Sequence, residues 1–346
     1  MDNKTNVSIS IIIPTFNRRR ELTECLESLA HQEGSPNFEV IVVDDGSEDG
    51  TFESIQSNSI RFPFPLKVIQ QKRGGPGKAR NTGARHAKGS TLLFIDSDCC
   101  AKTNWVKCLS GKIVCDDKIV GGPAITSLKA SLFSMAVNYI THTWIGGWGD
   151  KWHAFGLIPG FRLRGMNFGI KREFFLSQNG FKQLWYGEDT EFSERLRAQG
   201  YSIKRSDEVI VIHCESRSVY DYMLEAFAKG WTVIKLLIHL LIPFRLLYII
   251  PFLLFSSILF SLILAVVSIK SYFLFQVFIV VYCLLLIIYA IKGSWIYNHP
   301  ELLVVIPIMG FLLHVCYAVG TACGLFLIGV PTKNALRPNK AINLKL

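Results

Sequence analysis

The chain has 346 residues, half of them hydrophobic, and a net charge of +10. This composition is too apolar for one ordinary soluble domain, and the length indicates about two domains. The positive charge fits the Lys and Arg that membrane proteins carry on their cytoplasmic side, and it also fits an anionic ligand such as a nucleotide diphosphate. The basic residues are scattered without an aromatic–basic repeat, which argues against a nucleic-acid partner.

The nine cysteines show no spacing typical of a disulfide framework, and no CxxC pair with zinc spacing is present. We therefore expect reduced thiols, as in cytosolic and membrane proteins. The first ten residues lack an apolar segment after a basic start, so we expect no signal peptide.

The hydrophobic residues are distributed unevenly along the chain. Up to about Lys229 the sequence is typical of a globular protein, whereas Leu, Ile, Val and Phe dominate from Thr232 onward. We expect a soluble domain over residues 1–220, an interfacial amphipathic helix over 221–245, membrane-spanning helices over 246–330 and a basic tail over 331–346.

Strands and helices are predicted to alternate in the first hundred residues. The expected strands cover Val7–Ile13, which ends at Pro14, then Phe38–Val43, Leu66–Gln70 and Thr91–Ile95, and the expected helices cover Glu21–Ala30, Glu48–Ser57 and Gly77–Ala87. This alternation indicates βαβ units and a parallel sheet that is covered on both faces. Ligands of such sheets bind at the carboxyl ends of the strands.

The pattern becomes irregular after Asn104, and we expect loops at Gly121–Pro123 and at Trp144–Gly149. Order returns with a possible strand at Asn167–Ile170, a helix at Asp189–Gln199 and a strand at Val209–His213.

Three apolar stretches follow, and each is long enough to cross a membrane, which takes about 20 residues. Leu246–Ile269 and Tyr272–Ile291 are separated only by Lys270-Ser271, which predicts a tight hairpin. Leu302–Val330 contains Pro307 and several glycines, so it either spans the membrane or lies along its interface. Three spans, or two spans and an interfacial segment, both remain open.

Acidic residues follow two of the predicted strands. Asp96 and Asp98 can bind one hard cation, Mg²⁺ or Mn²⁺, although a solvated turn or a helix cap explains the spacing equally well. Asp44 and Asp45 can accept hydrogen bonds from a base or a ribose, but Asp also favours turns for local hydrogen bonding.

A glycine-rich segment, residues 74–77, precedes a helix that carries Lys78, Arg80 and Asn81. Helix N-termini attract phosphates, and glycines let the backbone approach them. The spacing to Lys78 does not match a Walker A loop. A flexible turn with a basic helix start is the alternative.

Two further sites have a structural and a chemical interpretation. Glu188 and Asp189 begin a helix, where acidic residues are common for dipole reasons, but one of them can also act as a general base near an acceptor hydroxyl. His213 ends a strand and is either structural or a metal ligand.

Taken in order, these segments resemble the family-2 glycosyltransferases, which have the GT-A fold. The resemblance covers roughly Ser8–Arg217 and includes SIIIPTFNR, VIVVDDGSEDGT, GGPGKARNTGARHAKG, LLFIDSD, GMNFGIKREFF, GEDTEFSERLRAQGY and VIVIH. It implies an α/β fold with a Rossmann-like, mostly parallel sheet, followed here by an α-helical membrane region.

The resemblance also implies roles for individual residues. It assigns nucleotide-sugar binding to Pro14, Thr15, Asn17, Asp44, Asp45, Arg80, Asn81 and Asp96; Mn²⁺ or Mg²⁺ binding to Asp96, Asp98 and His213; base catalysis to Asp189 with Glu188; and the acceptor side to Asn167 and Trp185.

The expected reaction is an inverting transfer of one sugar from a nucleotide-diphosphate sugar. The QxxRW-type motif of processive members is absent from Arg217–Trp231, which favours one sugar per event. We expect a lipid-linked glycan or surface polysaccharide precursor as acceptor, because the aromatic stretch Trp144–Phe161 suits sugar stacking. A polyprenyl-phosphate acceptor and a nucleotidyltransferase activity are the alternatives.

We expect a multi-pass protein of the cell membrane, in contact with membrane lipid, whose catalytic domain faces the cytosol. The absence of an export signal and the cytosolic origin of nucleotide-sugars are the reasons for this placement.

Overall fold

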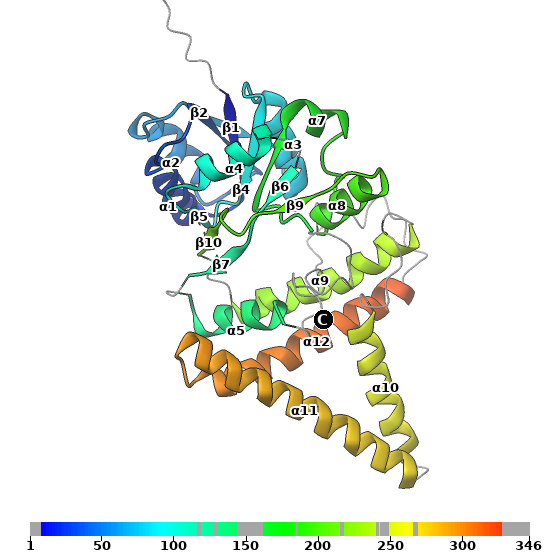
Figure 1. Cartoon of the computed structure of the whole chain (residues 1–346). Coiled ribbons are helices and arrows are strands. Elements are labelled where there is room, and N and C mark those ends of the chain that lie inside the picture. Colours follow the sequence, from blue (N-terminus) through cyan, green and yellow to red (C-terminus); the bar gives the residue numbers. More distant parts are fainter. Residues whose placement is uncertain are drawn as a thin grey trace, which may run out of the picture. The chain divides into compact units, whose positions relative to one another are not determined.

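A computed structural model describes residues 8–115, 119–127, 130–143, 162–184, 186–214, 218–239, 242, 249–265 and 269–326 (Figure 1). The chain divides into two compact units, which are described separately. An α/β unit lies within Met1–Ser127 and Gly160–Glu215, and a helical unit lies within Leu128–Pro159 and Ser216–Val330.

A seven-stranded sheet forms the centre of the α/β unit, in the order β3-β2-β1-β4-β8-β6-β9. The strands are β1 (Ile9–Thr15), β2 (Phe38–Asp44), β3 (Leu66–Gln70), β4 (Thr91–Ile95), β6 (Ile119–Gly121), β8 (Asn167–Lys171) and β9 (Lys204–Arg205). The first four are mutually parallel, whereas β8 is antiparallel to both β4 and β6. The predicted α/β fold with a mostly parallel sheet is confirmed.

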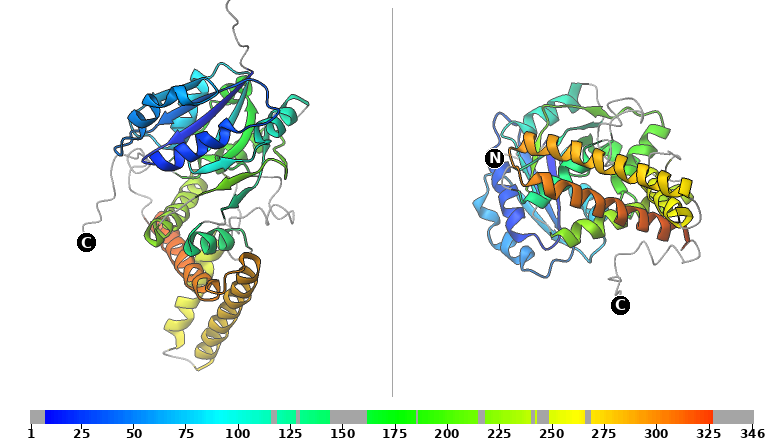
Figure 2. Two further views of the ribbon diagram at one scale, coloured as in Figure 1. Left: turned by 90° about the vertical axis from the view of Figure 1, so that its left-hand side faces the viewer. Right: turned by 90° about the horizontal axis from the view of Figure 1, so that it is seen from below.

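Helices cover both faces of this sheet, as Figure 2 shows from two further sides. One face packs against α1 (Arg19–Ala30), α2 (Thr51–Ser57) and α4 (Trp105–Cys115), and the other against α3 (Pro76–His86), α7 (Arg172–Ser177) and α8 (Glu188–Ala198). Strand β1 shows the reason, because Ile11 and Ile13 face the first layer and Ile12 faces the second. A strand that is buried on both faces has a continuous apolar sequence.

A small second sheet joins β5 (Cys99–Ala101), β10 (Val211–His213) and β7 (Ala124–Thr126) in that order. Strand β10 is antiparallel to β5, with His213 opposite Cys99. This pairing places His213 beside the residues that directly follow β4, more than a hundred positions earlier in the chain.

The four predicted strands and three predicted helices of the first hundred residues are confirmed, apart from their ends. Strand β1 continues through Pro14, which pairs with Val43, so the prediction that the strand ends at Pro14 is wrong. The loop expected at residues 121–123 connects β6 and β7, except that Gly121 ends β6, and the loop expected at residues 144–149 lies outside the described residues. Three elements after Asn104 were not predicted, namely α4, β6 and β7; the two strands have three residues each, which is too short to give a periodic signal.

The helical unit contains α5 (Leu132–Thr141), α9 (Val219–Ile238), α10 (Ile250–Ala265), α11 (Ile269–Tyr297) and α12 (Leu302–Phe326). In the part of the chain that the structure describes, Phe275–Tyr297 and Leu302–Phe326 are long and apolar enough to cross a membrane. Helix α10 is shorter than that. Because Lys270 and Ser271 lie inside α11, the prediction that they form the hairpin turn is wrong.

Helices α9 and α12 approach each other closely at glycines. A Cβ atom on Gly320 would lie 2.1 Å from the carbonyl oxygen of Phe227, and one on Gly230 would lie 2.2 Å from that of Tyr317. Small residues at such positions let two helix backbones come into contact. Helix α12 continues through Pro307, so the glycines of this stretch serve packing within one continuous helix.

Candidate active site

Asn17 connects the end of β1 to the loop that follows β2. Its backbone is in the left-handed region, with φ of 50°, which asparagine tolerates better than most residues. Its backbone N–H donates to Ser47 Oγ at 2.8 Å, and its Oδ1 accepts from the backbone N–H of Glu48 at 2.8 Å. Asn17 therefore fixes this loop at the carboxyl edge of the sheet.

Asp44 is the last residue of β2, Asp45 directly follows it, and both are buried. Asp45 accepts hydrogen bonds from the backbone N–H groups of Gly74 at 2.9 Å and Gly75 at 2.7 Å. Asp44 accepts from the backbone N–H of Ser47 at 3.2 Å and from its hydroxyl. Each carboxylate thus holds a loop of its own chain in place, and the recognition of a base by Asp45 stays a prediction.

Pro14 and Thr15 lie at the end of β1 beside these carboxylates. The backbone N–H of Asp45 donates to the carbonyl of Thr15 at 2.9 Å. The hydroxyl of Thr15 is buried, and it has no hydrogen-bond partner among the described residues. A buried hydroxyl without a partner is costly, so this atom is suited to meeting a ligand group at the strand end.

Arg80 connects two acidic residues that are far apart in the sequence. It is 2% exposed, and its guanidinium donates to Asp96 Oδ1 at 2.6 Å and to Glu188 Oε1 at 2.8 Å. A Cβ atom on Gly165 would lie 2.6 Å from Arg80 Nη2, so a larger residue there would displace the guanidinium. Arg80 thereby ties the end of β4 to the start of α8.

Burial raises the pKa of Glu188 to about 7, and the neighbouring Asp189 carboxylate raises it too. Arg80 opposes this shift, because its positive charge favours the ionised carboxylate. Burial lowers the pKa of the Arg80 guanidinium, but the carboxylates of Asp96 and Glu188 outweigh it and raise that pKa above its ordinary value. Glu188 is therefore a buried carboxyl group that changes charge near neutral pH.

Asp189 is partly exposed beside buried Glu188. Its Oδ1 accepts a hydrogen bond from the backbone N–H of Thr190 at 2.7 Å. Of the two acidic residues at the start of α8, Asp189 is thus the one accessible to an acceptor.

Two asparagines of the predicted site have a structural role. Asn81 exchanges hydrogen bonds of 2.7 and 2.9 Å with the backbone of Phe181. Asn167 is fully buried, accepts from the indole N–H of Trp105 at 2.8 Å, and donates to the carbonyls of Pro123 and Val209. The side-chain amide of Asn167 is fully used within the protein, so we assign it no contact with an acceptor.

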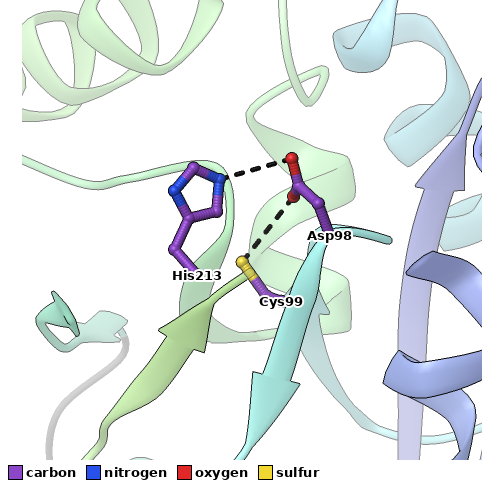
Figure 3. A group of neighbouring side chains, drawn as sticks. All are labelled: Asp98, Cys99 and His213. Carbon is purple, nitrogen blue, oxygen red and sulfur yellow. Dashed lines mark hydrogen bonds and ion pairs between the residues drawn. The ribbon is translucent and has the colours of Figure 1, made fainter. Parts of the chain in front are cut away.

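Asp98, Cys99 and His213 form a compact cluster where β4 leads into β5 (Figure 3). His213 Nε2 lies 3.3 Å from Asp98 Oδ2, and the Cys99 thiol donates to Asp98 Oδ1 at 3.8 Å. One ligand atom from each of the three residues lies within 4.8 Å of the others. The carboxylate, imidazole and thiol are therefore a donor set that fits a divalent cation.

Arg18 also pairs with Asp98, through its guanidinium and Oδ2. Asp96 is not part of the three-residue cluster, because its carboxylate faces Arg80. The prediction that Asp96 shares the cation with Asp98 stays a prediction. Sequence reasoning missed both Arg18 and Cys99, and the signal available was only their adjacency to Asn17 and Asp98.

The remaining acceptor-side predictions fall on Trp185 and on the aromatic stretch Trp144–Phe161. Both lie outside the described residues.

Parts of this chain are similar to known proteins in sequence and in fold. The family described as Glycosyl transferase family 2 matches residues 10–174, the segment that contains Asp45, Arg80 and Asp98. Poly(ribitol-phosphate) beta-N-acetylglucosaminyltransferase TarS of Staphylococcus aureus is 39% identical over 93 residues, which are 27% of this chain and 16% of TarS. Glycosyltransferase GlyG of Streptococcus pneumoniae is 28% identical over 186 residues, which are 48% of this chain and 58% of GlyG.

The chain thus spans less than two thirds of the length of these relatives. Among solved structures, the mannosyltransferase PcManGT from Pyrobaculum calidifontis, in complex with GDP-Man and Mn²⁺, aligns with a TM-score of 0.61 at 17% identity. That alignment covers 91% of this chain and 86% of the other, and it shows a shared fold. Residues 10–174, slightly less than half of the chain, thus match the family described as Glycosyl transferase family 2.

Proposed function

We propose that this protein transfers one glycosyl group, with inversion, from a nucleotide-diphosphate sugar to a hydroxyl of a membrane-associated acceptor. The observation that carries the proposal is the joining of the end of β4 to the start of α8 through Arg80. It ties a cation-binding carboxylate segment to an accessible carboxylate, Asp189, in a chain that matches this family over residues 10–174.

The donor side of the proposal uses the carboxyl edge of the parallel strands. Asp45 holds the turn at Gly74 and Gly75 before α3, whose N-terminus favours an anionic group such as a diphosphate. The hydroxyl of Thr15 is available to the nucleoside part. The neighbouring fold of PcManGT is recorded with GDP-Man, which supports a nucleotide-sugar donor.

Asp98 and His213, with Asp96 nearby, would hold Mn²⁺ or Mg²⁺. When bound, such a cation stabilises the charge of the departing nucleoside diphosphate. The structural neighbour is recorded with Mn²⁺. Arg18 and Arg80 bring fixed positive charge to the same edge, and this charge also favours an anionic leaving group.

On the acceptor side, Asp189 takes the proton from the attacking hydroxyl. The hydroxyl oxygen forms a bond to the anomeric carbon from the face opposite the diphosphate, and the bond from that carbon to the diphosphate oxygen breaks. One displacement of this kind inverts the anomeric configuration. Glu188 positions the start of α8 through Arg80 and does not itself need to contact the acceptor.

We further propose that the helical unit anchors the protein in the cell membrane, with the α/β unit in the cytosol. Two apolar helices, α11 and α12, support the anchor by length and composition. If these two helices are the spans, the basic tail from Lys333 stays on the cytosolic side, in line with the positive-inside tendency. Labelling of the variant Asn339→Cys on intact cells tests this, since labelling from outside contradicts the two-span topology.

The activity is tested by a donor screen on the purified full-length protein with membrane-extracted acceptors. We expect release of a nucleoside diphosphate together with transfer of the labelled sugar. Release of pyrophosphate instead would indicate a nucleotidyltransferase. Sugar transfer to polyprenyl phosphate alone would replace the hydroxyl acceptor by a phosphate acceptor.

A further inference from the structure

Cys99 brings a thiol into a cluster whose other two members are ordinary ligands of hard or borderline cations. Its side chain is fully buried, and its Sγ lies 3.8 Å from Asp98 Oδ1. The imidazole of His213 lies 3.3 Å from the other oxygen of the same carboxylate. Figure 3 shows the thiol and the imidazole both directed at Asp98.

This arrangement follows from the pairing of the small sheet. Cys99 opposes His213 in the antiparallel ladder between β5 and β10, so their positions are fixed by backbone hydrogen bonds. Asp98 directly precedes β5, and its carbonyl accepts from the backbone N–H of Cys214 at 2.8 Å. The three ligand atoms are therefore held by rigid strands, as a pre-formed metal site requires.

We infer that Cys99 is a third protein ligand of the cation site, and that this site binds the softer cations Zn²⁺, Co²⁺ and Cd²⁺ more tightly than Mg²⁺. Thiolates favour such cations, whereas Mg²⁺ prefers a shell of oxygen ligands. The inference rests on the cation proposed for Asp98 and His213.

The charge balance agrees with a divalent cation. Binding releases the proton of the Cys99 thiol to solvent, so that one thiolate and one carboxylate neutralise the two positive charges. The Arg18 guanidinium, which pairs with Asp98 in this structure, leaves the carboxylate when the cation binds. The positive partner of Asp98 is exchanged, and the carboxylate is never left unpaired.

A second pair of thiols has to be separated from this site in any experiment. Cys100 Sγ and Cys214 Sγ lie 3.6 Å apart; Cys100 follows Cys99 in β5, and Cys214 directly follows β10. Two thiols at this distance can also bind a soft cation, because tetrahedral zinc holds its sulfur ligands at about 2.3 Å. The variant that carries both Cys100→Ser and Cys214→Ser removes this pair and keeps Cys99, so it is the matched background.

The test is Co²⁺ binding to the purified full-length protein, read by the ultraviolet charge-transfer band of thiolate-bound cobalt. We expect the band in the protein with Cys100→Ser and Cys214→Ser, and its loss when Cys99→Ser is added. Cd²⁺ affinity should fall at least about tenfold in the same step, while Mn²⁺ affinity changes by less than about threefold. A band that is absent from the Cys100→Ser, Cys214→Ser background, or that survives Cys99→Ser, overturns the inference.

Two controls keep the result decisive. If Cys99→Ser does not fold, cadmium-113 NMR of the background variant reports directly whether one thiolate binds the cation, since thiolate ligands shift the resonance strongly. Sugar transfer restored by Mn²⁺ after chelation reports on the proposed function separately. Transfer with Mn²⁺ but without a thiolate signal rejects the role of Cys99 and leaves the proposed function intact.

Discussion

Two pairs of acidic residues lie at the carboxyl ends of β2 and β4, the parallel strands on either side of β1, and their environments differ. Asp44 and Asp45, after β2, accept hydrogen bonds mainly from backbone and side-chain groups without charge. Asp96 and Asp98, after β4, instead pair with positively charged or chargeable groups, as the contacts to Arg80, Arg18 and His213 show.

The difference indicates what each pair does. A carboxylate that accepts from backbone N–H groups, as Asp45 does from Gly74, fixes the shape of a loop, and its removal leaves buried donors unsatisfied. A carboxylate beside a guanidinium, as Asp98 is beside Arg18, lies where an incoming cation can replace a positive charge. Substitution of Asp44 or Asp45 should therefore mainly lower the free energy of unfolding. Substitution of Asp96 or Asp98 should mainly lower the rate of sugar transfer.

The largest effect is expected for Asp98→Asn. The asparagine keeps the shape but not the charge, so we expect transfer to fall at least about a thousandfold, because cation stabilisation of the leaving group is worth several kcal/mol. Calorimetry should show weakened Mn²⁺ binding, and the melting temperature should change little. Asp207→Asn is the matched control, because Asp207 is 76% exposed and its ion pair is with Arg205, two positions earlier in the chain. Normal transfer by Asp98→Asn in the presence of chelator would contradict the cation site.

The second effect concerns the acceptor side. Asp189→Asn should lower kcat by roughly 10²–10⁴-fold, because a general base contributes about that much, while the KM of the donor stays near normal. Initial rates over donor concentration provide the measurement. Loss of donor binding with unchanged turnover of bound donor would mean that Asp189 binds the donor and is not the general base.

A third variant tests the loop-shaping pair directly. Asp45→Asn places an amide N–H₂ or a single acceptor oxygen where Gly74 and Gly75 both donate, so one buried donor loses its partner at a cost of about 1–3 kcal/mol. We expect the melting temperature to fall by several degrees and the KM of the donor to rise, with kcat least affected. A large loss of kcat at unchanged melting temperature would mean that Asp45, like Asp98, acts in the reaction. The proposed difference between the two acidic pairs would then be wrong.

The sequence was sufficient for the parts that depend on local pattern. Continuous apolar strands and their alternating helices predicted the sheet, and acidic residues at strand ends predicted where the site lies. The register between β5 and β10, which places His213 opposite Cys99, could not be read from strands of three residues, because pairing over such a distance leaves no periodic signal.

The hydrogen-bond partners of individual side chains could not be predicted from the sequence either. Arg80 matched a motif beside the donor, but its actual partners, Asp96 and Glu188, are 16 and 108 positions away. Asn167 matched an acceptor-side element, yet it is the buried partner of Trp105. A motif gives the position of a residue in a family, whereas burial and tertiary packing decide which atoms remain free for a ligand.

The smallest expected effect concerns Glu188. Because its pKa of about 7 in the folded protein differs from that in the unfolded chain, the free energy of unfolding depends on pH. In the unfolded chain a glutamate ionises near 4.3, so between that pH and about 7 the folded protein retains a proton that the unfolded chain has lost. The contribution of this carboxyl group to stability is fully present below about 4.3, and it is lost as the pH rises through 7. Glu188→Gln is neutral throughout, and its side-chain amide oxygen can still accept a hydrogen bond from Arg80.

The melting temperature of Glu188→Gln relative to wild type should therefore rise between pH 5 and pH 8, by an amount on the order of 2 °C for a protein of this size. Glu208→Gln is the control, because Glu208 is 70% exposed and its variant should show no such trend. A difference that stays constant with pH would mean that Arg80 keeps Glu188 ionised in the folded state. Glu188 and the Arg80 guanidinium would then form an ion pair at every pH between 5 and 8.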